Sequence, residues 1–92
     1  MKYYNWDNEK NRILKEDRNI SFEEIIFQIL NDGLIEIIEH TNNEKYAGQK
    51  IYIVKHKDYV YLVPFVERDN ELFLKTIFPS RKYTKKYLGD SK

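Results

Sequence analysis

Residues 50–67 read KIYIVKHKDYVYLVPFVE, two alternating runs of side chains on either side of Lys57-Asp58. Both runs, Lys50–His56 and Tyr59–Glu67, are rich in the β-branched and aromatic residues that are enriched in strands. Two polar residues between such runs are typical of the tight turn of a hairpin. The sequence therefore predicts two antiparallel strands here, with the rest of the fold built around them.

The flanking segments supply the other elements. Asp69-Asn70 predicts a second turn, followed by a strand over Glu71–Phe78. Leu34–Glu39 can be interpreted as a helix or a strand, and its β-branched content favours a strand. The remaining predicted elements are a strand over Lys2–Trp6, helices over Asn8–Glu16 and Phe22–Leu30, and a closing helix over about Arg81–Leu88.

Local signals mark the helix ends. Ser21 stands three residues before Glu24, the spacing of a capping box in which each side chain satisfies the other residue's backbone N–H. Asp7 and Ser80 are the expected caps of the first and last helices. Gly33 is expected to end the second helix in the left-handed conformation, which glycine adopts without steric cost.

Length and composition limit the class of protein. A chain of 92 residues is expected to form one domain, residues 1–92, and the absence of cysteine excludes disulfides and thiolate sites. The order of elements predicts an α+β fold: an antiparallel sheet of about four to five strands, two N-terminal helices on one face and a short C-terminal helix. No apolar run approaches the roughly 18 residues of a membrane span, and the chain does not start like a signal peptide. We therefore expect a cytoplasmic protein with no membrane partner.

Charge is divided along the chain. The net charge of +1 combines five basic and ten acidic residues up to Glu44 with eleven basic and five acidic residues from Lys45 onward. Such a division is consistent with a polyanionic partner for the basic half, or simply with solvated charged faces.

The two turns determine which strand residues share a face. They pair positions whose numbers sum to 115 and 139, so that Tyr52 faces Val63 and Leu62 faces Ile77. One face is then mostly aliphatic, and it is expected to lie beneath the Phe22–Leu30 helix. Its apolar members are Ile51, Ile53, Val60, Leu62, Phe73 and Ile77.

The opposite face, called here the ring-bearing face, holds Tyr52, Val54, His56, Tyr59, Tyr61, Val63, Phe65, Leu74, Thr76 and Phe78. Tyrosine offers a ring for stacking and a polar tip, which suits unpaired bases, so Tyr52 and Tyr61 are predicted to contact nucleic acid. The closing helix adds cations that would attract phosphate, namely Arg81, Lys82, Lys85 and Lys86. The alternative is that this helix covers part of the rings as a second small core.

Three stretches resemble the BrnT toxin family. Tyr4–Arg12 reads YNWDNEKNR, similar to the aromatic–Trp-Asp–x–x–Lys-Asn opening of that family. Ile20–Glu24 reads ISFEE, like the family's next helix start, and Ile77–Thr84 reads IFPSRKYT, like its strand running into the last helix. The middle of the chain differs from the family.

The resemblance implies a RelE-like fold and cleavage of mRNA, free or on the ribosome, that halts translation. It also implies a cognate antitoxin of the ribbon-helix-helix kind that buries the active surface of this type II toxin. Two arginines of the family align with Lys45 and with Thr76, which is next to Lys75. A third basic position of the family aligns with Arg81, where this chain has the same kind of side chain.

Metal-independent cleavage needs a base for the 2′-hydroxyl, cations for the phosphorane and an acid for the leaving 5′-oxygen. Stabilisation of the phosphorane charge is often the largest contribution to the rate, and Arg81 is the cation predicted to supply it, assisted by Lys45 or Lys75. His56 is the predicted acid or base because histidine titrates near neutral pH, although a strand histidine beside a turn is more often an ordinary surface residue. Acids and histidines are scattered, so no metal or other cofactor is expected.

Two other functions fit the same features. One is a non-catalytic RNA-binding module that uses the ring-bearing face and the basic helix without cleavage. The other is an interaction protein whose ring-bearing face binds a protein partner.

Overall fold

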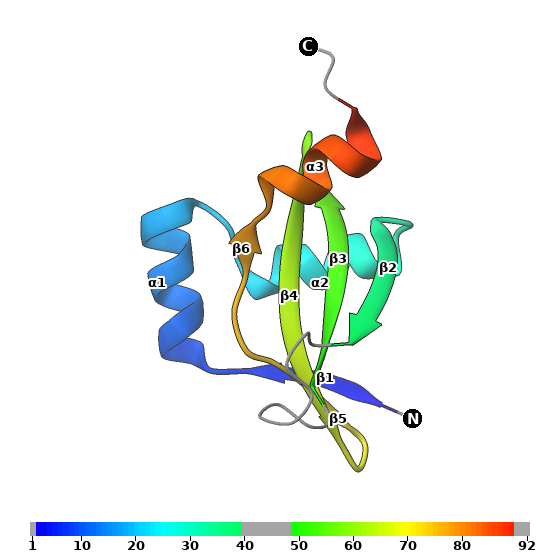
Figure 1. Cartoon of the computed structure of the whole chain (residues 1–92). Coiled ribbons are helices and arrows are strands. Elements are labelled where there is room, and N and C mark those ends of the chain that lie inside the picture. The colour runs from blue at the N-terminus through cyan, green and yellow to red at the C-terminus, as the bar shows by residue number, and fades with distance from the viewer. Residues whose placement is uncertain (1, 40–48, 90–92) are drawn as a thin grey trace.

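The computed structural model describes residues 2–39 and 49–89, which form an α+β fold with three helices (Figure 1). The elements are, in order, β1 (Tyr3–Trp6), α1 (Asn8–Arg18), α2 (Phe22–Leu30), β2 (Leu34–Glu39), β3 (Gln49–His56), β4 (Tyr59–Arg68), β5 (Glu71–Leu74), β6 (Phe78–Pro79) and α3 (Arg81–Leu88). The predicted class and most predicted elements are confirmed, including the strand at Leu34–Glu39.

The strands form one open, mostly antiparallel sheet in the order β1-β5-β4-β3-β2, with β6 pairing β4 beyond the end of β5. The register predicted for the central hairpin is confirmed, because Tyr52 pairs with Val63 and His56 with Tyr59. The prediction of about four to five antiparallel strands is corrected to six strands among the described residues, because the last predicted strand is divided into β5 and β6. The sheet is also not wholly antiparallel, since β1 pairs with β5 in parallel.

The strand predicted over Glu71–Phe78 is in fact two strands. β5 keeps the expected register, but Phe78 pairs with Leu62, where Ile77 was expected. The residues between β5 and β6 turn Ile77 into the core, where its side chain is fully buried. Arg18 Nη1 donates a hydrogen bond to the Ile77 carbonyl at 3.0 Å, so this backbone oxygen keeps a partner outside the ladder.

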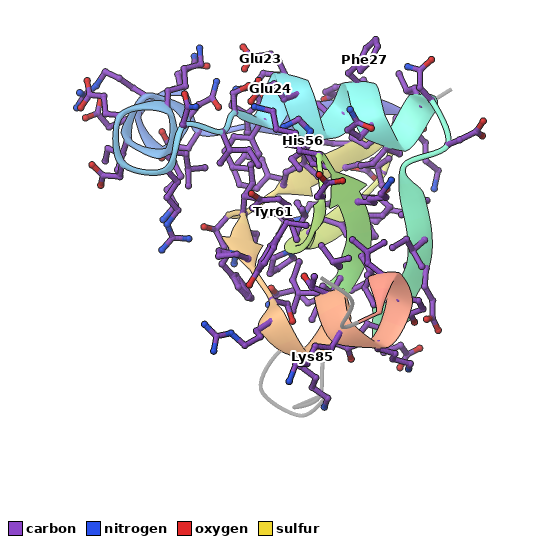
Figure 2. All side chains as sticks on the ribbon, turned by 90° about the horizontal axis from the view of Figure 1, so that it is seen from above. Glu23, Glu24, Phe27, His56, Tyr61 and Lys85 are labelled. Atoms are coloured by element: carbon purple, nitrogen blue, oxygen red, sulfur yellow. The ribbon has the colours of Figure 1, made fainter. Side chains whose placement is uncertain are left out.

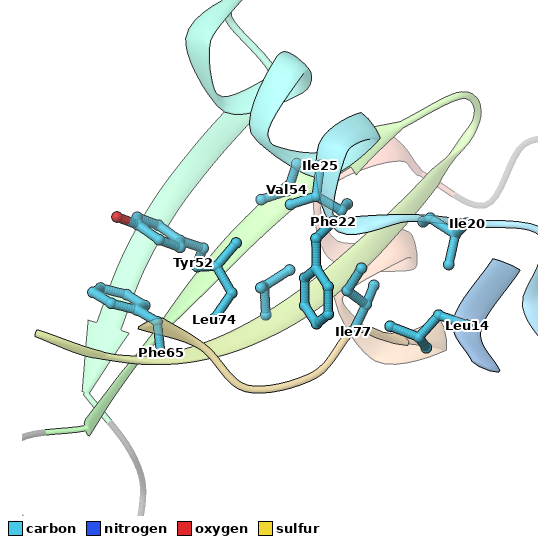
Figure 3. Close-up of a cluster of buried hydrophobic side chains, with 10 residues drawn as sticks. Leu14, Ile20, Phe22, Ile25, Tyr52, Val54, Phe65, Leu74 and Ile77 are labelled. Atoms are coloured by element: carbon cyan, nitrogen blue, oxygen red, sulfur yellow. The ribbon is translucent and has the colours of Figure 1, made fainter. Parts of the chain in front are cut away.

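α2 and α3 cover opposite faces of the sheet, as the view from above shows (Figure 2). The prediction that the aliphatic face lies beneath α2 is wrong, because Phe22 and Ile25 of α2 pack in one core with the ring-bearing face (Figure 3). Rings bury more area than aliphatic chains, so this arrangement puts the largest side chains into the larger core. The core residues are Leu14, Ile20, Phe22, Ile25, Tyr52, Val54, Val63, Phe65, Leu74 and Ile77.

The N-terminal residues that resemble the BrnT family join α1 to α2. Asn11 Oδ1 accepts from the Phe22 N–H at 2.8 Å, and Asn11 Nδ2 donates to Glu23 Oε1 at 2.8 Å. The Trp6 ring stacks on the Phe22 ring, with centroids 5.9 Å apart. Asp7 caps α1 as predicted. These residues therefore have a structural role.

The end of α2 differs from the prediction in one residue. Asp32, not Gly33, has the positive φ of 73°. Gly33 is required for space instead, because a Cβ there would lie 2.8 Å from the Gln28 Cβ. The predicted capping box of Ser21 and Glu24 at the other end of α2 is confirmed.

In the described ranges, each of the helices is too short or too polar to traverse a lipid bilayer.

Candidate functional site

α3 covers only one end of its sheet face. It is fixed near the β3–β4 turn, where the Val60 N–H donates to Thr84 Oγ1 at 2.9 Å, and Tyr87 Oη donates to Glu36 on β2. The β4–β5 hairpin lies at the other end of the sheet (Figure 1). Strand alternation puts the following side chains together on that uncovered end, which we call the open face: Tyr3, Asn5, Val66, Arg68, Glu71, Phe73 and Lys75.

The open face contains a pocket of about 380 Å³, lined by Val66, Arg68, Glu71, Phe73 and Lys75. Val66 pairs with Phe73, and both are half-buried, so they form an apolar floor. Arg68 and Lys75 are exposed, and no ion pair of the described residues engages either cation or Glu71. The pocket therefore offers two cations and one carboxylate to a ligand.

The Glu71 carboxylate is held in place by Asn5. Asn5 Nδ2 donates to Glu71 Oε2 at 2.7 Å, while Asn5 Oδ1 accepts from the Trp6 N–H at 2.9 Å. The amide is thus oriented by the backbone of its own strand. Since only Oε2 receives the Asn5 amide, Glu71 Oε1 can still accept a proton or a hydrogen bond.

α3 adds a cationic row at the other end of the same face. Its cations are exposed and it carries no acidic residue. Lys86 Nζ lies 5.7 Å from the Tyr83 ring centroid and 5.2 Å from that of Tyr87, and Lys85 points away from the sheet (Figure 2). The members of this cationic row are Arg81, Lys82, Lys85 and Lys86.

Of the predicted site residues, the structure puts only Lys75 in the pocket. Arg81 lies in the cationic row, and Lys45 lies outside the described residues. His56 is 7% exposed on the α2 side of the sheet, and neither of its ring nitrogens has a hydrogen-bond partner among the described residues. His56 and Lys75 therefore lie on opposite faces.

The predicted base contacts are also on the α2 side. Tyr52 is 5% exposed and stacks on Phe65, so it offers no ring to a base. Tyr61 is half-buried, with its ring centroid 6.1 Å from that of His56. Burial raises the pKa of both phenols, with Tyr59 and Glu24 adding to the shift at Tyr61. The prediction of an exposed stacking platform on this face is wrong because the face forms the core.

Sequence reasoning missed Arg68, Glu71 and Asn5. A partial signal was present, since strand alternation in the predicted register puts Lys75, two residues after Phe73, on the same face as Phe73. The position of Asn5 had no such signal, because it depends on the parallel pairing of β1 with β5.

The described residues contain no group of three or more potential metal ligands close together. No family model matches the chain, and neither a curated protein nor a solved structure matches it.

Proposed function

We propose that this chain is a metal-independent endoribonuclease with a RelE-like fold, the toxin of a type II toxin–antitoxin system that cleaves mRNA. The observation that supports this is the pocket of the open face, where Arg68, Lys75 and Glu71 surround an apolar floor. The BrnT-like stretches agree with the same proposal.

The pocket residues suit the three tasks of the reaction. Glu71 accepts the proton of the 2′-hydroxyl, whose oxygen forms a bond to phosphorus as the bond to the 5′-oxygen breaks. Arg68 binds two phosphate oxygens with its planar fork, and Lys75 stabilises the charge and protonates the leaving 5′-oxygen. The products are a 2′,3′-cyclic phosphate and a free 5′-hydroxyl.

In this proposal the cationic row of α3 binds phosphates that flank the cleaved one. The whole segment from Lys75 to Leu88 has five basic residues and no acid, so it favours a polyanion. Arg81, the cation predicted for the reaction centre, then contributes to binding, and Lys75 takes the role at the phosphorane.

The proposed protein partner is a cognate antitoxin of the ribbon-helix-helix kind, and the proposed location is the cytoplasm. An antitoxin that covers the open face would block the pocket from RNA. A second candidate function is a non-catalytic RNA-binding module, which the exposed cationic row of α3 favours. RNA binding through the ring-bearing face is disfavoured, because Tyr52 on that face is buried.

The test is cleavage of single-stranded RNA by the purified chain in EDTA. The parent is expected to cleave and to leave 2′,3′-cyclic phosphate ends. Glu71→Gln and Lys75→Ala are expected to lose at least about 100-fold in rate. Lys50→Ala is the matched control, since Lys50 is an exposed strand lysine on the α2 side of the sheet.

Circular dichroism of each variant shows whether it still folds. If the parent binds RNA but never cleaves it, the second candidate replaces the nuclease. If Glu71→Gln and Lys75→Ala cleave like the parent, the pocket is not the reaction centre.

A further inference from the structure

Tyr3 is an exposed aromatic residue beside the pocket. The residue is 56% exposed, and its main-chain N–H donates to the Asn70 carbonyl at 2.8 Å. Tyr3 pairs with Glu71 in the parallel ladder, and paired residues project to the same side of a sheet. The ring therefore lies on the open face, one strand over from the carboxylate.

The other two rings of β1 are committed to packing. Tyr4 contacts Tyr52, with ring centroids 6.5 Å apart, and Trp6 stacks on Phe22. By alternation Tyr3 points the opposite way, and among the described residues no ring contacts it. Within residues 2–39 and 49–89, Tyr3 is thus the ring of β1 that lies on the face of the pocket without an aromatic partner.

We propose that Tyr3 stacks on the base of an unpaired nucleotide whose phosphate is bound by Arg68 and Lys75. This inference rests on the proposed function and adds a substrate class: single-stranded RNA with an unstacked base beside the bound phosphate. The faces of a base in a duplex are covered by its neighbours, so a stacking residue selects unpaired RNA. Every base has such a face, so Tyr3 provides binding without strict sequence selection.

The test uses a single-stranded oligonucleotide with 2′-O-methyl sugars, which cannot be cleaved, and one 2-aminopurine, whose fluorescence is quenched by stacking. The parent and Tyr3→Phe are expected to bind it and to quench the probe as they bind. Tyr3→Ala is expected to bind about 5- to 150-fold more weakly and to leave the fluorescence high when saturated. Phe27→Ala is the control, because Phe27 is a comparable ring, 61% exposed on the outer side of α2.

The outcomes separate this inference from the function on which it rests. If Tyr3→Ala binds and quenches like the parent, Tyr3 does not stack on a base, whatever the pocket does. If the parent cleaves RNA but binds a duplex of the same sequence as tightly as the single strand, selection of unpaired bases is wrong. If the parent neither binds nor cleaves RNA, the proposed function fails and this inference fails with it.

Discussion

The ring of Tyr52 stacks on the ring of Phe65, with centroids 3.9 Å apart and planes inclined by 11°. The two residues belong to adjacent strands, β3 and β4, and both are almost fully buried beside Leu74 (Figure 3). This contact lies on the α2 side of the sheet, so the larger core and the pocket occupy opposite faces. Packing of the core and access to the pocket can therefore be altered separately.

Burial of Tyr52 predicts a loss of stability in alkali. Burial, with the Tyr4 hydroxyl adding to it, raises the pKa of Tyr52 in the folded chain above the ordinary value of about 10. Above pH 10 the unfolded chain releases this proton and the folded chain keeps it, so the free energy of unfolding falls as pH rises. Tyr52→Phe should reduce that slope by up to about 1.4 kcal/mol per pH unit, as measured by urea unfolding. Between pH 7 and 9 the parent and Tyr52→Phe should have equal slopes. Equal slopes above pH 10 as well would contradict the prediction.

His56 predicts a stabilising substitution. Its two ring nitrogens are buried without a partner among the described residues, a state that costs about 1–3 kcal/mol. His56→Leu should therefore raise the urea midpoint without changing the m-value, whereas His56→Gln should not. RNA cleavage should survive His56→Leu, because the residue lies on the face opposite the pocket. A destabilised His56→Leu variant would show that the imidazole has a partner.

Local signals in the sequence were sufficient for most of the fold. The capping box at Ser21, the cap at Asp7 and the turn at Lys57-Asp58 act over a few residues, so their effect can be read directly from the chain. The faces could not be assigned in this way, because alternation groups residues without showing which group a distant helix covers. Both faces of this sheet are apolar, with Ile53 and Val54 each fully buried, so hydrophobicity alone did not distinguish them.

The same uncertainty about which face a helix covers explains why only one of the pocket residues was predicted from the sequence. Lys75 was predicted from the resemblance to the BrnT family, because it is next to Thr76, the position of a family arginine, and it does line the pocket. Arg68 and Glu71 flank an ordinary turn in the sequence, and they became candidates only when the uncovered face was known.

Asn11 predicts a strong effect from a small polar side chain. It is 5% exposed and binds both the Phe22 N–H and the Glu23 carboxylate. Asn11→Ala leaves the buried Phe22 N–H without a partner, so the free energy of unfolding should fall by about 1–3 kcal/mol in urea. Asn8→Ala, at the exposed start of α1, is the control and should change it by less than about 1 kcal/mol.

Glu23 gives the same prediction a pH dependence. The hydrogen bond from Asn11 holds the pKa of Glu23 below its ordinary value. The contribution of this carboxylate is therefore present above about pH 4.3 and is lost as pH falls through the lower, folded-state pKa. Asn11→Ala should flatten the stability curve below pH 4.3, and an unchanged curve would contradict the assignment.

Thr84 predicts how α3 is attached to the sheet. Thr84 Oγ1 accepts from the N–H of Val60, and it donates to the Ser80 carbonyl at 2.6 Å. Thr84→Val has nearly the same shape but leaves the Val60 N–H unpaired, so the amide of Val60 should exchange with deuterium markedly faster. Thr84→Ser keeps the hydroxyl and should preserve slow exchange. Equal protection in both variants would mean that α3 is held by other contacts.

The cationic row predicts the salt dependence of RNA binding. Each phosphate contact to single-stranded nucleic acid contributes about 0.7 to the slope of log affinity against log salt concentration. Lys85 is exposed and points away from the sheet, so Lys85→Ala should lower the slope by about that amount and change stability by less than about 0.5 kcal/mol. Lys50→Ala removes another exposed lysine, from the α2 side of the sheet, and should leave the slope unchanged. If both variants lower the slope equally, RNA is attracted by the net charge of the protein, and the lysines of α3 make no specific phosphate contacts.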